Sequence, residues 1–418
     1  MYTYGSSPAE RRLKVFSEKS GGTVSALGIE VTQAIQNMNH DVRLIAGKKT
    51  VVRVYLKPNA LPRNLRVRGE IIVSRGPGTP ARFVSSKNVV SLQETDHPSL
   101  TDQRGDAELS LNFELPQRGV GDLVVQFNRV IPATRGDDVP ISNPELTREV
   151  TFVSAPPLRV RVLGMRFTDE RVTPAKNFAP DAVHFDYLKS YLTRTFPVPG
   201  LEWSQIVVNA GSGIKPPFSS PTPMQFDPIW SAAAGRVIAR LQMLRQADVN
   251  AGRDPRTHYY GLFADDSGFF QGRASRVPAD ADPSVVAFGP TGNPSNFAAF
   301  DWDKDASFGD WYGAHELAHT FGCRHPGCRA TPTAQPSQGR DPASTFPYAL
   351  GRLSDGAEGC VGFDVGDPDL GEPMRALPHR TTSDFMTYCD NQWVSKHTYD
   401  ALFDRLIEED INFAPVIG

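Results

Sequence analysis

Three histidines and a glutamate share one short segment of the chain, in the order His315-Glu316-x-x-His319-x-x-Gly322-x-x-His325. In a helix, positions i and i+4 lie on one face, so His315 and His319 would direct two imidazoles toward a single point. Gly322 can adopt a positive φ and end the helix, and the turn would bring His325 back as a third ligand. Three imidazole nitrogens with one open coordination position are typical of a catalytic zinc site.

Glu316 follows the first histidine and is rotated away from the histidine pair, so it would hold a water molecule rather than the metal. A carboxylate in that position can take a proton from the attacking water during amide hydrolysis. The five fixed positions of the motif coincide by chance in on the order of one in tens of thousands of chains of this composition. The alternative is a degenerate site without a metal, but all four chemically active residues are present.

A helix over about residues 309–321 is expected to carry this motif. Ser307 is the predicted N-cap, with Asp310 three residues later in a capping-box relation. At about 100° per residue, the apolar side chains fall on an arc separate from the histidines and should face the core. These apolar residues are Trp311, Ala314, Leu317, Ala318 and Phe321.

Two segments resemble the metzincin metallopeptidases. HELAHTFGCRH resembles their extended zinc motif, and SDFMTYC is similar to their methionine turn, with Met386 at the matching position. The specific resemblance covers about residues 255–410, and the region before it looks more loosely like the β-sandwich of multidomain bacterial metzincins. The resemblance implies a zinc-dependent endopeptidase with one catalytic Zn²⁺ and a protein or glycoprotein substrate.

The same resemblance implies a role for each residue of the site. His315, His319 and His325 would bind the metal, and Glu316 would be the general base. Met386 would pack beneath the histidines, and Tyr388 would donate a hydrogen bond to the developing oxyanion.

Two positions depart from the pattern of the clan. Ala318 stands where glycine is usual, and because alanine is the better helix former we expect no loss of function. Pro326 follows the third histidine, which does not fit the better-known subfamilies, so the sequence leaves subfamily and cleavage preference open.

The four cysteines all lie in the last quarter of the chain, which favours two disulfides and an oxidising compartment over four buried thiols. The spacing leaves three pairings open. The resemblance to metzincins implies a bridge between Cys328 and Cys389, which flank the metal site, and Cys323 would then pair with Cys360. The protein is therefore expected to be extracellular, although its first twenty residues contain no secretory signal peptide.

Two further segments are candidates for binding. Residues 269–275 read as a short edge strand, and Phe270, Gln271, Gly272 and Arg273 could pair with an extended substrate by β-addition. The alternative is an ordinary strand with a glycine bulge. Ca²⁺ could bind an acidic loop, although a solvated loop fits the spacing better. The acidic residues of this loop are Asp364, Asp367, Asp369 and Glu372.

The fold class that we predict is multidomain. Residues 1–21 read as a flexible arm, and residues 22–155 contain about seven short strands, which suggests an immunoglobulin-like β-sandwich. Residues 158–418 mix helices and strands and read as an α/β or α+β metzincin-like domain. Its helices are expected at 180–195, 228–247 and 396–410, and a buried strand at 258–264.

Composition excludes two classes of partner. The formal net charge of −3 gives no electrostatic support for binding nucleic acid, and no apolar run is long enough to span a membrane. The sequence leaves the oligomeric state open. Two other functions stay in view: a zinc amidase that acts on cell-wall peptides, and a glycan- or protein-binding module with a degenerate protease domain.

Overall fold

The computed structural model describes most of the chain. The described residues are 22–61, 65–76, 78–93, 97–116, 118–134, 136–169, 173–211, 228–264, 271–296, 300–328, 339–356 and 359–414. The predicted N-terminal arm and Phe270 lie outside them. No described helix is both long and apolar enough to cross a membrane.

Two β-sheets enclose the apolar core of the N-terminal part. The first sheet has the order β1-β4-β8, and its strands are β1 (Thr23–Thr32), β4 (Thr50–Asn59) and β8 (Leu111–Leu115). The second has the order β3-β10-β9-β5-β6, with β7 also paired to β5. Its strands are β3 (Leu44–Ile45), β10 (Thr147–Val153), β9 (Gly121–Pro132), β5 (Leu65–Ser74), β6 (Arg82–Ser85) and β7 (Val90–Leu92). The core between the sheets draws on residues from Val24 to Phe152.

Buried and partly exposed residues alternate along β5, as expected of a strand with one face on the core, but they do not alternate along β4. In β5, Val67, Ile71 and Val73 are buried while their neighbours are partly exposed. In β4, Arg53 and Tyr55 are buried as well. A short helix, α1 (Leu100–Arg104), and the segments next to it cover this second face.

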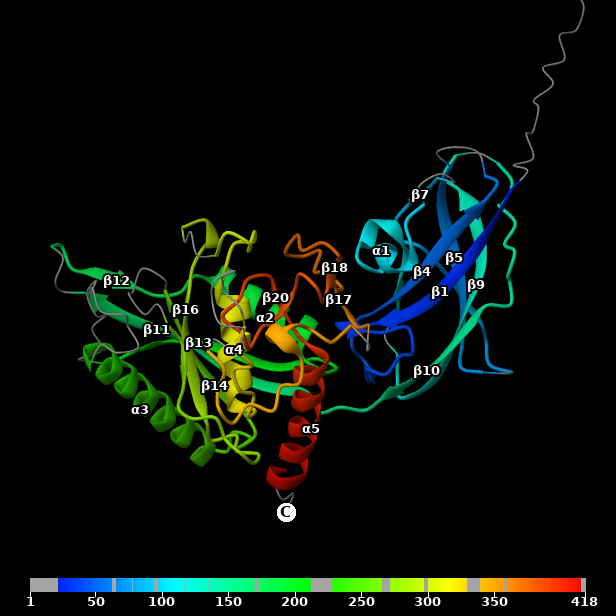
Figure 1. Cartoon of the computed structure of the whole chain (residues 1–418). Helices are drawn as coiled ribbons and strands as arrows, with labels where there is room; N and C mark the ends of the chain where they lie inside the picture. The colour runs from blue at the N-terminus through cyan, green and yellow to red at the C-terminus, as the bar shows by residue number, and fades with distance from the viewer. Residues whose placement is uncertain are drawn as a thin grey trace, which may run out of the picture.

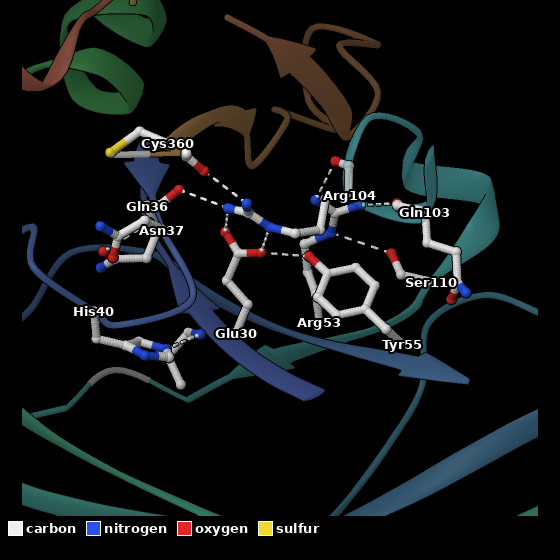
Figure 2. Close-up of polar contacts among 12 residues, drawn as sticks. Glu30, Gln36, Asn37, His40, Arg53, Tyr55, Gln103, Arg104, Ser110 and Cys360 are labelled. Carbon is white, nitrogen blue, oxygen red and sulfur yellow. Dashed lines mark hydrogen bonds and ion pairs between the residues drawn. The ribbon is translucent and has the colours of Figure 1, made fainter. Parts of the chain in front are cut away.

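A buried polar network joins the sandwich to the rest of the chain (Figure 2). The Arg104 side chain donates to the Glu30 carboxylate, with 3.0 Å between Nε and Oε2. The same guanidinium donates to the backbone oxygens of Gln36 and Gly359, at 3.0 and 2.6 Å. Next to it, β2 (Ile35–Gln36) pairs with β17 (Val361–Asp364), which also pairs with β18 (Arg375–Pro378).

The C-terminal part is built on a separate six-stranded sheet that contains both parallel and antiparallel strand pairs. Four neighbouring strands run parallel in the order β13-β11-β14-β16: β13 (Leu201–Asn209), β11 (Leu158–Asp169), β14 (His258–Ala264) and β16 (Val286–Thr291). Two short antiparallel strands, β12 (Lys176–Phe178) and β15 (Arg273–Ala274), pair with β11 and β16 respectively. β14 is buried along nearly its whole length, as expected of a parallel strand covered on both faces.

Helices cover both faces of this sheet (Figure 1). The helix α3 (Pro228–Asn250) packs on one face, where Ala233, Val237 and Leu241 join the core. On the other side lie α2 (Ala182–Thr195), α4 (Gly309–Thr320) and α5 (Lys396–Phe413). These three helices share one apolar core with the strands of the sheet. The predicted helices at 180–195, 228–247 and 396–410 correspond to α2, α3 and α5.

The protein is therefore a sheet-rich mixed α and β structure with several sheets, which agrees with the multidomain prediction at that level. The immunoglobulin-like topology of the sandwich stays a prediction. The two parts also share a core, because Ala34, Ile35, Val42 and Ile45 pack with residues of α2 and α4. The N-terminal segment that contains β2 and β3 thus belongs to both parts.

Candidate metal centre

Helix α4 positions the first two histidines. All five predicted apolar residues of this helix region lie in one core cluster, so the separation of packing face and histidine face is confirmed. The predicted capping box is wrong, because α4 begins at Gly309 and its N-cap is Phe308, without a side-chain cap. The Ser307 hydroxyl accepts from the Gly309 N–H at 3.3 Å and also contacts His184 Nδ1 and Thr291 Oγ1, while Asp310 accepts from the N–H of Trp311.

The three histidine side chains converge through their Nε2 atoms. Nε2 of His325 lies 3.1 Å from that of His315 and 3.0 Å from that of His319. The Nδ1 atoms of His315 and His319 are each 2.7 Å from a backbone oxygen, of Phe385 and Cys323 respectively. Because these Nδ1 atoms must donate, both Nε2 atoms are left as acceptors with their lone pairs turned inward.

Protons alone cannot satisfy this arrangement. His325 Nε2 has at most one proton to donate, and it faces two acceptor nitrogens. A cation at the centre would satisfy all three nitrogens at once, and backbone partners on the outer ring nitrogens are typical of metal-binding histidines. The triad could therefore hold a metal ion.

Burial keeps the imidazoles neutral, which metal binding requires. Desolvation, together with the neighbouring His325, lowers the pKa of His319 to about 3. The pKa of His315 falls well below its ordinary value for the same reasons, and burial lowers the pKa of His325. All three imidazoles are thus uncharged near neutral pH, the state in which they can bind a metal ion.

The turn after α4 brings the third histidine back. Gly322 has φ +87°, as predicted, and a Cβ at this position would lie 2.8 Å from the Pro278 oxygen. The N–H of Cys323 donates to Ala318 O at 3.1 Å, which closes the helix end. Only glycine fits this turn without displacing backbone.

Glu316 lies beside the triad under the edge of the sheet. Its side chain is buried, which raises its pKa to about 8, and the Ala274 N–H donates to the carboxylate. A Cβ on Gly272 would be 2.5 Å from a Glu316 carboxylate oxygen. The segment that leads into β15 therefore passes directly over the glutamate. Glycine at position 272 permits this close approach because it has no side chain.

A cavity of about 390 Å³ opens in front of these residues. His315, Glu316, Gln271 and Gly272 border it, together with Tyr388. The remaining walls are formed by Phe300, Trp302, Trp311, Tyr312, Thr387, Cys389, Asp390 and Gln392. The centre is thus open to a molecule considerably larger than water, and half of these remaining wall residues are aromatic.

The predicted methionine turn lies next to the histidines. Met386 is buried in the same core as α4, and its neighbour Phe385 supplies the backbone oxygen that orients His315. The turn connects two short parallel strands, β19 (Ser383–Asp384) and β20 (Gln392–Trp393). Tyr388 is exposed, and its hydroxyl lies 3.0 Å from His325 Nε2.

One of the two predicted disulfides is present. Cys328 and Cys389 are bonded, so the bridge links the segment after the third histidine to the end of the methionine turn. The predicted bridge between Cys323 and Cys360 is wrong, since both are thiols. Cys323 ends the turn after α4, while Cys360 directly precedes β17 near the sandwich. The two cysteines therefore lie on different elements and are not paired.

The two other candidate segments have different outcomes. Gln271 and Gly272 border the cavity and Arg273 begins β15, so the described part of the predicted strand lies beside the triad. The acidic loop is not a simple solvated loop: Asp364 is fully buried and ion-paired with Arg194 and Arg375. The Asp367 carboxylate accepts from Ser190 Oγ at 2.6 Å.

Several residues of the cavity were not identified from the sequence. Tyr312 accepts a hydrogen bond from the Gly272 N–H at 2.9 Å and so helps to place the edge strand. Its position three residues before His315 on one helix was a usable signal. Trp302 and Gln392 come from segments without regular spacing to the motif, so no such signal exists for them.

Comparison with known proteins adds no family assignment. No protein-family model matches this sequence, and no curated protein matches it. A function for this protein must therefore be argued from the geometry of the site.

Proposed function

We propose that this protein is a zinc-dependent endopeptidase with its centre at His315, His319 and His325. The observation that carries the proposal is the convergence of three Nε2 atoms, with the outer nitrogens of His315 and His319 held by backbone oxygens. Three neutral imidazoles suit zinc, and they leave a coordination position for a substrate or water. An ion so placed would polarise the scissile carbonyl and lower the pKa of water.

The side chains around the triad supply the other requirements of amide hydrolysis. Glu316 accepts a proton from the attacking water and delivers it to the leaving amine. Positive charge at the adjacent triad would favour its ionised form against the effect of burial. Although the Tyr388 side chain as a whole is exposed, desolvation of its hydroxyl beside His325 and the nearby Glu316 raise its pKa to about 12, so the hydroxyl keeps its proton and can donate to the developing oxyanion.

The shape of the site favours an extended peptide as substrate. β15 is paired with β16, and a substrate segment adding to its other edge would lie across Glu316. The aromatic walls formed by Phe300, Trp302 and Trp311 suit an apolar substrate side chain. The Cys328–Cys389 bridge favours an oxidising, extracellular location for this activity.

The first experiment compares wild type with His319→Ala and Glu316→Gln. Zinc per chain is measured by elemental analysis, and cleavage is measured on casein and on a quenched-fluorescent peptide library. Wild type should bind about one zinc, which His319→Ala should lose. Glu316→Gln should keep the zinc and lose about 10²-fold or more in cleavage rate, because it removes the general base.

His379→Ala is the matched control, since His379 is partly exposed and lies outside the triad. It should retain zinc and activity. A wild-type protein that takes up no zinc, or a Glu316→Gln variant that cleaves as fast as wild type, would exclude the proposed function.

A further inference from the structure

Three carboxylates meet beside the beginning of α4, away from the histidine triad. One oxygen from each of Asp303, Asp305 and Asp310 lies within 4.8 Å of the others. Asp310 is 2% exposed, and the other two are half-buried. Burial and mutual repulsion raise the pKa of Asp305 to about 7 and that of Asp310 well above its usual range.

The nearby basic side chains offset the charge of these carboxylates only in part, because Arg194 and Arg375 lower the aspartate pKa values less than burial and mutual repulsion raise them. Among the described residues, no lysine or arginine forms an ion pair with any of the three. Arg194 and Arg375 border the same cavity, but both are paired with Asp364, and Arg375 also lies 3.4 Å from Glu372. Ionising all three carboxyl groups in this poorly solvated place is therefore costly without a counter-ion, which is why their pKa values are raised.

A buried oxygen without a partner is a second and independent indication of a ligand. Gln392 is 9% exposed and borders the same cavity as the three aspartates. Its Nε2 donates to the backbone oxygens of Thr387 and Cys389, both at 2.9 Å, which fixes the orientation of the amide. Its Oε1 faces away from those oxygens and has no hydrogen-bond partner. Such an atom is rare in a folded interior unless an ion or water meets it.

The cavity that these residues border has the size of an ion site. The cavity measures about 80 Å³, which is room for a cation and one or two waters, each water occupying roughly 30 Å³. Its polar walls offer acceptor oxygens on one side, and those oxygens come from three separate segments of the chain.

We propose that Asp303, Asp305, Asp310 and Gln392 form a calcium site. Three carboxylates and an amide oxygen are the hard donors that Ca²⁺ takes, and an irregular oxygen cage suits it better than Mg²⁺, which demands near-ideal octahedral geometry. The ion would tie the segment before α4 and α4 itself to β20. The site is separate from the histidine triad and does not depend on the proposed peptidase activity.

Calcium here would also support the larger cavity. Trp302, Trp311 and Gln392 border both cavities, and the Trp311 Nε1–H donates to Asp303 at 2.8 Å. An ion on Asp303 would fix a tryptophan that forms the wall of the candidate substrate cavity. Loss of the ion should therefore loosen that wall without removing the triad.

Terbium luminescence tests the site, because Tb³⁺ replaces Ca²⁺ and the three tryptophans that border the cavity, Trp302, Trp311 and Trp393, can excite it. The full chain is freed of calcium on a chelating resin and titrated with Tb³⁺, and Ca²⁺ is then used to displace it. Wild type should give saturable emission that Ca²⁺ removes, and Ca²⁺ should raise its thermal midpoint. Asp305→Asn and Asp303→Asn should each weaken binding by about tenfold or more, since each removes a charged ligand.

Two variants serve as controls. Asp369→Asn removes an exposed carboxylate that does not border the cavity, and His319→Ala removes a triad histidine; both should keep the calcium response. Circular dichroism shows that each variant is folded. The proposal is overturned if wild type gives no calcium response, if the response persists in both aspartate variants, or if Mg²⁺ binds as tightly as Ca²⁺.

Discussion

At the scale of single residues, the site depends on close approaches as much as on the ligands themselves. Gly272 lies over Glu316 so closely that any Cβ there would enter the space of the carboxylate. Sequence spacing could not link Gly272 to the glutamate that it covers, because the two residues lie on different elements. A glycine is here a positioning residue for the proposed general base.

The substitution Gly272→Ala should therefore reduce cleavage about 10²-fold while zinc content stays unchanged. The added methyl group forces the carboxylate to move, and displacements of about 1 Å can cost this much in rate. The measurement is kcat/KM on the best peptide, together with zinc per chain.

Gly235→Ala is the matched control, since a Cβ at this exposed position of α3 meets no other atom within 4 Å. It should leave activity unchanged. If Gly272→Ala cleaves at the wild-type rate, Glu316 is not held as the structure indicates.

At the scale of elements, the sequence predicts what lies on one helix and misses what several segments bring together. The spacing of His315, His319 and Gly322 sufficed to predict α4 and its turn, because helical geometry alone relates these positions. The aspartates at and before the start of α4 border the same cavity as Gln392, which lies about eighty residues further along the chain. No local pattern encodes that arrangement.

Local patterns also failed where tertiary contacts override them. Ser307 has the chemistry of an N-cap, but contacts with Thr291 and His184 engage its hydroxyl. The second face of β4 reads as solvent-exposed because it carries Arg53 and Tyr55. Both are buried, since a helix distant in sequence covers them.

The disulfide joins two segments that converge on the candidate metal centre, so its removal tests their coupling. Cys328 follows the third histidine and Cys389 follows Tyr388, and the two cysteines are 61 positions apart in sequence. Replacing both by serine should lower the free energy of unfolding by about 4 kcal/mol on the loop-entropy model. Cleavage should fall as well, because the bridge restrains the segments that carry His325 and Tyr388.

Denaturant unfolding and peptide cleavage measure the two effects. Cys323→Ser is the control, because this thiol is near the centre but forms no disulfide. An unchanged stability in the double variant would mean that the bridge does not restrain the unfolded chain as expected.

At the scale of the whole molecule, buried polar contacts tie the sandwich to the domain that carries the site. Lys48, in the turn between β3 and β4, donates to the backbone oxygen of Phe196 at 2.8 Å, just after α2. The Arg104 side chain donates to the backbone oxygens of Gly359 and Gln36 and forms an ion pair with Glu30 (Figure 2). The two parts should therefore unfold together rather than as independent domains.

Arg104→Met tests that coupling. Burial opposes the ionisation of Glu30, but Arg104 and Arg53 hold its pKa below the usual value, so the carboxylate is charged and fully buried. Removing Arg104 leaves that charge without its main partner, which should cost about 3–5 kcal/mol. It should also separate the single thermal transition into two in calorimetry, since the contacts to Gly359 and Gln36 are lost.

A double variant separates the charge from the junction. Glu30→Gln combined with Arg104→Met removes the unpaired charge, so it should be more stable than Arg104→Met alone, yet should still unfold in two transitions. Arg129→Met is the control, because Arg129 pairs with Asp138 at the surface and its loss should change stability by about 0.5 kcal/mol or less. If Arg104→Met retains one transition at the wild-type temperature, the network in Figure 2 is not what joins the sandwich to the domain with the metal centre.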